Sequence, residues 1–201
     1  CVGVELCEDL WAPVPPSCAL AQAGATVILN LSASDELASK DSYRRMLVRS
    51  QSGRLLCAYA YTDAGAGEST TDLVFSGHRI LAENGSVLAE SRPFTTGLTV
   101  AEIDLERIAQ ERRRMTTWPG GGDAEVIPFT LAAPDFTPER VFPCLPFVPE
   151  DRGDLAERCE MILRMQAEGL AARLSHIGAK SAVLGISGGL DSTLALLVTV
   201  R

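Results

Sequence analysis

The chain has 201 residues, of which 46% are hydrophobic and 22% charged, and its mean hydropathy is +0.12. These values predict a packed core, arranged as one domain or two small ones. The formal net charge of −8 argues against nonspecific nucleic-acid binding, which needs a basic surface, and no apolar run reaches the ~18 residues of a membrane span.

The six cysteines form no Cys-x-x-Cys pair, and His78 and His176 lie far apart in the sequence. We therefore expect neither zinc nor haem, and no disulfide scaffold. Free thiols are typical of a reducing compartment, so the pattern favours the cytoplasm. The first residue is Cys1, and the last lies nine residues after a motif at 187–192, so we expect an internal fragment of a longer protein.

The first half of the chain alternates strands and helices. A strand, a helix ending at Gly24 and a second strand predict a parallel pair in a covered sheet. Asn84-Gly85, between two apolar runs, indicates a type I′ hairpin. A longer helix is expected to place Tyr43, Met46, Leu47 and Ser50 on one face. In chain order the predicted elements are strand 2–6, helix 19–23, strand 26–31, helix 41–54, strand 56–62, strand 72–76 and the hairpin strands 79–82 and 87–89.

The second half is less regular. Residues 102–114 predict a solvated helix whose charged end accounts for the arginine run at 112–114. Residues 116–150 are rich in proline and predict a covering linker, with the apolar residues Val126, Ile127, Phe142 and Phe147 packed on a domain. Residues 151–177 predict an amphipathic helix, because Leu155, Cys159, Ile162, Gln166, Leu170, Leu174 and Ile177 recur at steps of three and four.

The sequence Ser-Gly-Gly-Leu-Asp-Ser at 187–192 follows an apolar run at 182–186 and precedes an apolar run at 193–197. This pattern predicts a strand, a glycine turn and a helix. Glycines allow close backbone approach, and a helix amino end attracts phosphate. The lysine of the common P-loop is missing, and Asp191 stands where a cation can be held. The alternative is an ordinary strand–turn–helix corner without a ligand.

This loop resembles the pyrophosphate loop of the ATP pyrophosphatases, which split ATP between the α and β phosphates and transfer AMP to a substrate oxygen. The resemblance implies ATP as substrate and Mg²⁺ bound by Asp191. It assigns ATP and pyrophosphate binding to Gly185, Ile186, Ser187, Gly188, Gly189, Leu190, Asp191 and Ser192.

Cys7 stands at the end of the first predicted strand, directly before a turn in which Glu8 and Asp9 follow. A side chain there projects from the edge of the sheet, and the backbone N–H groups that follow it can hold an oxyanion. Cys7 is therefore a candidate nucleophile. The alternative is a small buried core cysteine. Cys18, Cys57, Cys144 and Cys159 are interpreted as core or surface thiols.

The Cys7 segment resembles the nucleophile segment of the nitrilase-type amidase domain of glutamine-dependent NAD synthetases. That family releases ammonia from glutamine through a cysteine thioester. The ammonia then displaces AMP from adenylated nicotinic acid adenine dinucleotide, which gives NAD. The resemblance implies that Ser34 and Lys40 bind glutamine, although Lys40 replaces an Arg of some members. The matching segments, in order, are 3–11, 30–34, 67–73, 83–85, 146–149 and the loop at 187–192.

The resemblance also implies the architecture, which is α/β. Residues 1–100 are expected to be the carboxyl-terminal portion of a nitrilase-type αββα sandwich, 101–150 a covering linker, and 151–201 the start of a Rossmann-like ATP-pyrophosphatase domain. The family's Glu base and Lys precede its cysteine segment, so we expect the chain to be inactive alone. Family members are homo-oligomers with an ammonia tunnel, act without nucleic acid or membranes, and are ATP-dependent amide ligases.

Two other readings stay open. Asparagine synthetases also carry the Ser-Gly-Gly-Leu-Asp-Ser loop and use an amino-terminal cysteine, which here is Cys1. A partial gene product without catalysis is the second alternative. Glu8 and Glu68 are further candidates to line the pocket, or they make structural hydrogen bonds.

Overall fold

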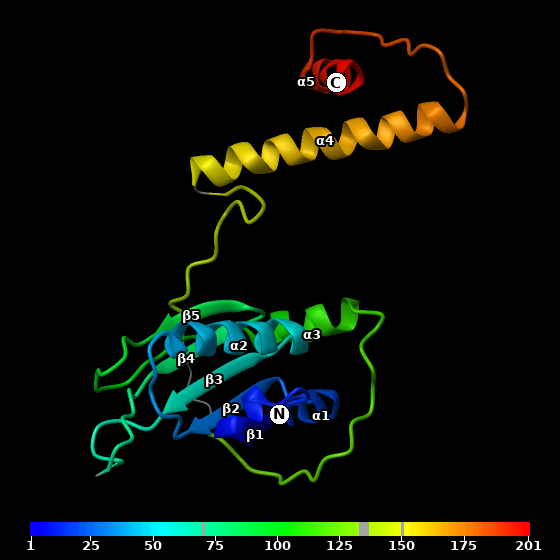
Figure 1. The fold of residues 1–201 in the computed structure, drawn as a ribbon. Coiled ribbons are helices and arrows are strands. Elements are labelled where there is room, and N and C mark those ends of the chain that lie inside the picture. Colours follow the sequence, from blue (N-terminus) through cyan, green and yellow to red (C-terminus); the bar gives the residue numbers. More distant parts are fainter. Residues whose placement is uncertain (70, 133–136, 150) are drawn as a thin grey trace. The chain divides into compact units, whose positions relative to one another are not determined.

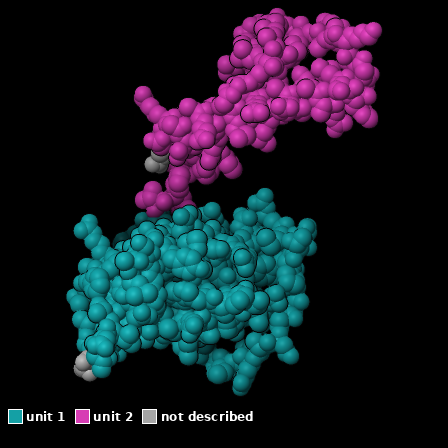
Figure 2. Space-filling view, viewed as in Figure 1, with its two compact units in different colours: residues 1–140 teal, residues 141–201 magenta. Residues whose placement is uncertain are grey.

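The computed structural model describes residues 1–69, 71–132, 137–149 and 151–201. Within these ranges the chain forms two compact units, residues 1–140 and 141–201, which are coloured separately in Figure 2. Parts of the predicted motif at 67–73 and of the predicted linker at 116–150 lie outside the described residues, namely residues 70, 133–136 and 150.

A five-stranded mixed sheet organises the first unit (Figure 1). Its strands follow one another in chain order, with the first three parallel and the last two antiparallel. This arrangement confirms the predicted parallel pair. The strands are β1 (Val2–Leu6), β2 (Val27–Ser32), β3 (Ala58–Asp63), β4 (Arg79–Glu83) and β5 (Ser86–Glu90).

Helices α1 (Ser17–Gln22) and α2 (Lys40–Leu55) connect the parallel strands and cover one face of the sheet. The strand residues on this face are buried, as Gly3 and Glu5 are in β1, whereas Val2 and its alternate neighbours on the other face are exposed. The core therefore lies between one sheet face and these helices. Its buried apolar side chains include Ile28, Val48, Leu55, Tyr59, Tyr61 and Ile80.

The buried face of α2 differs from the expected one. Tyr43 and Met46 are each 51% exposed, whereas Leu47 packs against the core. The residues that α2 buries are Arg44, Val48, Gln51, Ser52 and Leu55. Polar side chains occupy inward positions because they pair with other buried polar groups, for instance Gln51 Nε2 with Ser17 Oγ at 2.9 Å. A hydrophobicity pattern cannot reveal such partners.

The hairpin prediction is confirmed. Asn84 and Gly85 have φ values of 47° and 83°, as a type I′ turn requires. The predicted strand at 72–76 is wrong, because this segment is irregular. The backbone N–H of Asp63 bonds instead to the carbonyl of His78, so β4 takes the position beside β3 and leaves residues 72–76 outside the ladder.

Helix α3 (Leu105–Arg114) confirms the predicted helix, but one of its arginines is not solvated. Arg112 donates to the carbonyls of Ala25, Leu55 and Leu56 at 2.7–3.0 Å. Its guanidinium carbon lies 4.6 Å from the ring centroid of Trp118, which itself packs against the core. Arg112 therefore joins the turns that precede β2 and β3.

The apolar residues predicted to anchor the linker are exposed, so that expectation is wrong. Val126, Ile127 and Phe147 are 73%, 78% and 84% exposed, and Phe142 is 50% exposed. The residue of this segment that packs against the core is Trp118, and Gly122 lies against the backbone at the carboxyl end of α1.

The second unit contains helices α4 (Arg152–His176) and α5 (Leu190–Val200), and no residue of either is buried. Helix α4 and its end at Gly178, with φ 66°, were predicted. The strand expected at 182–186 is absent, because no other strand of the described part of this unit can pair with it. No described helix is both long and apolar enough to cross a membrane.

Candidate active site

Cys7 lies directly after β1 and begins a short 3₁₀ helix, η1 (Cys7–Trp11). Its φ of 46° falls in the left-handed region, which a residue with a side chain rarely adopts. Such strain persists only where the surrounding structure holds it, and it concentrates at functional sites. The Cys7 side chain is partly exposed. A strained, accessible cysteine at a strand end suits a nucleophile.

The three parallel strands end at the same edge of the sheet. Leu6 pairs with Leu31, and Ser32 pairs with Asp63. Cys7, Ser32 and Asp63 therefore lie at the same level of this sheet edge. Ligands of parallel α/β sheets bind at the carboxyl ends of the strands. The predicted strand ends therefore meet as a single polar edge, with Ser34 close behind in the chain.

A buried hydrogen-bond chain lies beneath Cys7. Asn30 Nδ2 donates to the Cys7 carbonyl at 3.4 Å and to the Tyr59 hydroxyl at 3.2 Å. The Tyr59 hydroxyl donates to Glu5, and the other Glu5 oxygen accepts from the Ser17 backbone N–H at 2.8 Å. Burial, and then the Glu5 carboxyl, raise the pKa of Tyr59, so its phenol stays protonated and remains a donor.

Tyr61 sits beneath η1 and beside α2. Its ring lies 6.3 Å from that of Trp11, and the Arg44 guanidinium carbon is 5.6 Å from its centroid. Burial raises the pKa of Tyr61 to about 12, with the neighbouring Cys7 and Asp63 adding to the effect. Tyr61 therefore also keeps its proton at neutral pH.

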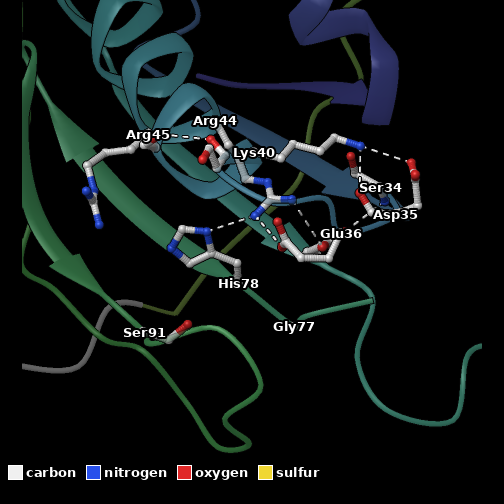
Figure 3. A network of polar contacts seen from close by, with 12 residues as sticks. Ser34, Asp35, Glu36, Lys40, Arg44, Arg45, Gly77, His78 and Ser91 are labelled. Atoms are coloured by element: carbon white, nitrogen blue, oxygen red, sulfur yellow. Dashed lines mark hydrogen bonds and ion pairs between the residues drawn. The ribbon is translucent and has the colours of Figure 1, made fainter. Parts of the chain in front are cut away.

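Arg44 is fully buried at the centre of a charged network (Figure 3). Its Nη1 donates to Glu36 Oε2 and to His78 Nδ1, each at 3.0 Å, and its Nη2 lies 3.9 Å from Asp63 Oδ2. Because arginine only donates, His78 Nδ1 accepts, and His78 Nε2 donates to Glu90 Oε1 at 2.8 Å. The network thus joins α2 to β3, to His78 directly before β4, and to β5.

Asp63 links this network to the expected glutamine-binding segment. Its Oδ1 accepts from the backbone N–H of Ser34 at 2.9 Å. Burial raises the pKa of Asp63, and the Ser34 N–H and Arg44 only partly offset this. The conformation of the chain at Ser34 is therefore set by a carboxylate that Arg44 stabilises.

The structure places the two predicted glutamine-binding residues in the same segment. Ser34 is buried, with its backbone on Asp63. Lys40 Nζ donates to the carbonyl and to Oδ1 of Asp35, at 2.6 and 2.9 Å, and this contact lowers the pKa of Asp35 (Figure 3). Lys40 therefore already has a carboxylate partner. Their contact with glutamine stays a prediction.

The other cysteines are placed differently from Cys7. Cys1 lies at the opposite, amino end of β1, where its carbonyl accepts from the backbone of Thr26 and Val27. Cys57 is buried, which raises its pKa to about 12 and makes it a poor nucleophile. Glu8 and Glu68 are exposed.

In the second unit, the loop predicted to bind pyrophosphate has the expected turn and helix. Gly188 has φ 84°, and Gly189 caps α5. Ser192 Oγ accepts from the Ser187 N–H at 3.3 Å and donates to the Gly189 carbonyl at 3.1 Å. Asp191 stands in the first turn of the helix. The described residues contain no cluster of three or more metal-ligating side chains.

Several site residues were not identified from the sequence, namely Asn30, Tyr59, Arg44 and Asp63. A signal for some of them exists in the alternation of the strands. The last inward positions before the carboxyl edge are polar in each parallel strand, namely Glu5, Ser32 and Asp63, and in β2 the preceding inward position, Asn30, is polar as well. Arg44 carries no such signal, because a charged residue on a helix is usually solvated.

The chain is similar to several known proteins. The family model of carbon-nitrogen hydrolases matches residues 1–113. Glutamine-dependent NAD(+) synthetases of Mycobacterium tuberculosis and Mycobacterium leprae are 42% and 43% identical over 210 residues, which cover 98% of this chain. The chain spans 31% of the length of these relatives. A solved carbon-nitrogen hydrolase from Helicobacter pylori is 22% identical, with a TM-score of 0.47 over 56% of this chain and 43% of that one.

Proposed function

The chain belongs to the carbon-nitrogen hydrolase family, and from this premise we propose that its first unit hydrolyses the side-chain amide of glutamine with Cys7 as the nucleophile. The observation that carries the proposal is the left-handed Cys7 at the carboxyl end of β1. The similarity to enzymes named glutamine-dependent NAD(+) synthetases supports glutamine as the amide.

The chemistry is acyl transfer to sulfur. The Cys7 thiolate attacks the amide carbonyl carbon and forms a tetrahedral oxyanion. The carbon–nitrogen bond then breaks, and nitrogen takes up a proton and leaves as ammonia. Water attacks the remaining thioester, which releases glutamate and returns the thiolate. Backbone N–H groups of η1 follow Cys7 directly and are the nearest candidates to hold the oxyanion.

For the whole protein we propose the synthesis of NAD. Ammonia released from glutamine at Cys7 would displace AMP from the adenylated carboxylate of nicotinic acid adenine dinucleotide, with ATP as the source of AMP. The names of the relatives support glutamine-dependent synthesis of NAD, and the adenylate step is part of this proposal. In this proposal the loop at 185–192 binds ATP and its pyrophosphate, because a glycine turn there opens into the amino end of α5. This unit would be the start of a Rossmann-like ATP-pyrophosphatase domain.

The donor set at this loop fits Mg²⁺ only together with phosphate. Asp191 supplies one exposed carboxylate, and Mg²⁺ in nucleotide sites is bound by one or two carboxylates plus phosphate oxygens. Mg²⁺ held by Asp191 would neutralise the charge of the departing pyrophosphate. The hydroxyl oxygens of Ser187 and Ser192, in the same loop, lie 3.3 Å apart.

A covalent label tests the role of Cys7. The chain is treated with a diazoketone analogue of glutamine, and the modified peptide is identified by mass spectrometry. We expect the label on Cys7, protection by excess glutamine, and no label in Cys7→Ala. Cys1→Ala is the matched control, because Cys1 is also a free thiol near β1, and it should be labelled at Cys7 like the unaltered chain.

The same experiment separates the alternatives. A label on Cys1 would overturn the proposal and favour an asparagine-synthetase-like use of the amino-terminal cysteine. Equal labelling of the exposed thiols Cys1, Cys144 and Cys159 without protection by glutamine would show that the chain carries no glutamine site.

A further inference from the structure

The strained backbone of Cys7 needs a restraint, because a residue with a side chain gains free energy by leaving the left-handed region. Within η1, the peptide after Cys7 is the part of the chain that must rotate if Cys7 relaxes. The side chain that bonds to this peptide is that of Asn30, whose amide nitrogen contacts the Cys7 carbonyl at 3.4 Å. This contact runs from β2 to η1, directly after the end of β1.

We propose that Asn30 is a positioning residue that holds Cys7 in its left-handed conformation through the Cys7 carbonyl, with Tyr59 and Glu5 fixing the Asn30 amide. The inference rests on the proposed nucleophilic role of Cys7 for its functional meaning. The geometry itself does not depend on that role.

The orientation of the Asn30 amide is determined by its second contact. Its Nδ2 also donates to the Tyr59 hydroxyl at 3.2 Å. Because the Tyr59 hydroxyl gives its own proton to Glu5, its oxygen can only accept from Asn30. The nitrogen of Asn30, rather than its oxygen, must therefore face both Tyr59 and Cys7. Asn30 Oδ1 is buried without a hydrogen-bond partner among the described residues, which is a cost that this orientation imposes.

The chain of contacts ends on rigid elements. Glu5 accepts from the backbone of Ser17 at the start of α1, and Ser17 Oγ accepts from Gln51 of α2 at 2.9 Å. Glu5, Ser17, Asn30, Tyr59 and Gln51 are all at most 5% exposed. Buried, connected polar networks specify one arrangement strongly. The position of the Cys7 carbonyl is thereby tied to two helices and to neighbouring strands.

The direction of the Cys7 thiol follows from its backbone. If φ relaxes to a negative value, the Cβ swings relative to the sheet edge, and the sulfur leaves its present position. Removing the Asn30 donor is therefore expected to slow every reaction that needs the thiol at this position, whether or not glutamine is the substrate. A merely structural residue would lower stability without changing the reactivity of the folded chain.

The experiment measures alkylation of Cys7 by iodoacetamide, with the Cys7 peptide quantified by mass spectrometry. Rates are compared at a pH high enough that they no longer rise with pH, so that the fraction of thiolate is the same in all variants. We expect Asn30→Ala and Asn30→Asp to react about tenfold more slowly than the unaltered chain. Tyr59→Phe should give a smaller loss, and the double variant no more than Asn30→Ala alone, because both residues act through one contact.

The matched control is Ile28→Ala, which alters a fully buried residue on the same face of β2, two positions before Asn30. It should lower stability and leave the Cys7 rate within about twofold, because sites that share no partner act independently of each other. Asn30→Asp keeps the shape of Asn30, so the alkylation rate is measured on this variant if Asn30→Ala does not fold. A rate for folded Asn30→Asp within about twofold of the unaltered chain would overturn the inference.

This outcome is distinct from failure of the proposed function. Alkylation does not require glutamine to bind. If the glutamine analogue fails to label Cys7 while Asn30→Asp still slows alkylation, the positioning role stands and the glutaminase role falls. If Cys7 is labelled and protected by glutamine but Asn30→Asp alkylates normally, the reverse holds.

Discussion

Replacement of Arg44 by Met removes the only buried cation of the charged network around Asp63 in the described part of the chain. The Asp63 side chain is fully buried, with Arg44 Nη2 at 3.9 Å, and Glu36 loses its 3.0 Å contact with Arg44. Removing one partner of a buried pair leaves an uncompensated charge and costs about 3–5 kcal/mol. This is a large part of the roughly 5–15 kcal/mol by which a domain is stable.

Urea unfolding, followed by tryptophan fluorescence, measures this cost. Both tryptophans of the chain, Trp11 and Trp118, lie in the first unit, so the signal reports on the network's own domain. Arg114→Met is the matched control, because Arg114 pairs with Glu111 at the surface with 71% of its side chain exposed. The control should change stability by less than about 0.5 kcal/mol.

The cost should also depend on pH. Burial raises the pKa of Asp63 above its ordinary 3.8, so folding favours its protonated form. That contribution is complete below pH 3.8 and is lost as the pH rises through the folded-state pKa. Without Arg44 the pKa of Asp63 rises further. The deficit of Arg44→Met should therefore grow with pH above 3.8 and shrink below it. A loss under about 1 kcal/mol at neutral pH, or one that grows in acid, would refute this reasoning.

Three further predictions concern other parts of the first unit. Arg112→Met leaves three backbone carbonyls without their donor and should cost about 2–3 kcal/mol in urea unfolding, whereas a loss no larger than a surface change would contradict the role of this residue. Gly85→Ala should lower Tm, because φ is 83° there and a residue with a Cβ is strained in that region. Gly120→Ala, where φ is not positive and the space is open, is the control. Despite burial, hydrogen bonds from Arg45 and then His78 keep the pKa of Glu90 below its ordinary 4.5, so the stability that Glu90 contributes is present above pH 4.5 and is lost as the pH falls. Glu90→Gln should therefore flatten the acid limb of a curve of stability against pH. An unchanged acid limb would be evidence against this role of Glu90.

Much of the first unit could be predicted from local patterns. The runs at 2–6 and 26–31 are apolar and β-branched, and Asn84-Gly85 has the turn chemistry that closes a two-residue hairpin. Helix α4 and its end at Gly178 follow from periodicity and from a glycine at positive φ. Cys7 became the candidate nucleophile because its place at the end of a predicted strand, directly before a turn, can be read from the order of residues.

The strand expected at 182–186 shows the limit of such patterns. An apolar run becomes a strand only where a neighbouring strand supplies hydrogen-bond partners, and the described part of residues 141–201 supplies none. The same limit explains residues 72–76, whose place beside β3 is taken by β4. Pairing is a property of the assembled sheet.

By itself, the sequence determined most helices and strands of the first unit, the nucleophile candidate and the glycine turn at 187–192, because each depends on neighbours along the chain. Tertiary structure alone decided that Arg44 would be buried and that Asn30 would reach the Cys7 carbonyl. Both are polar residues whose partners lie on other elements. Their burial is favourable only when folding brings those partners together, and no local sequence pattern shows that this will happen.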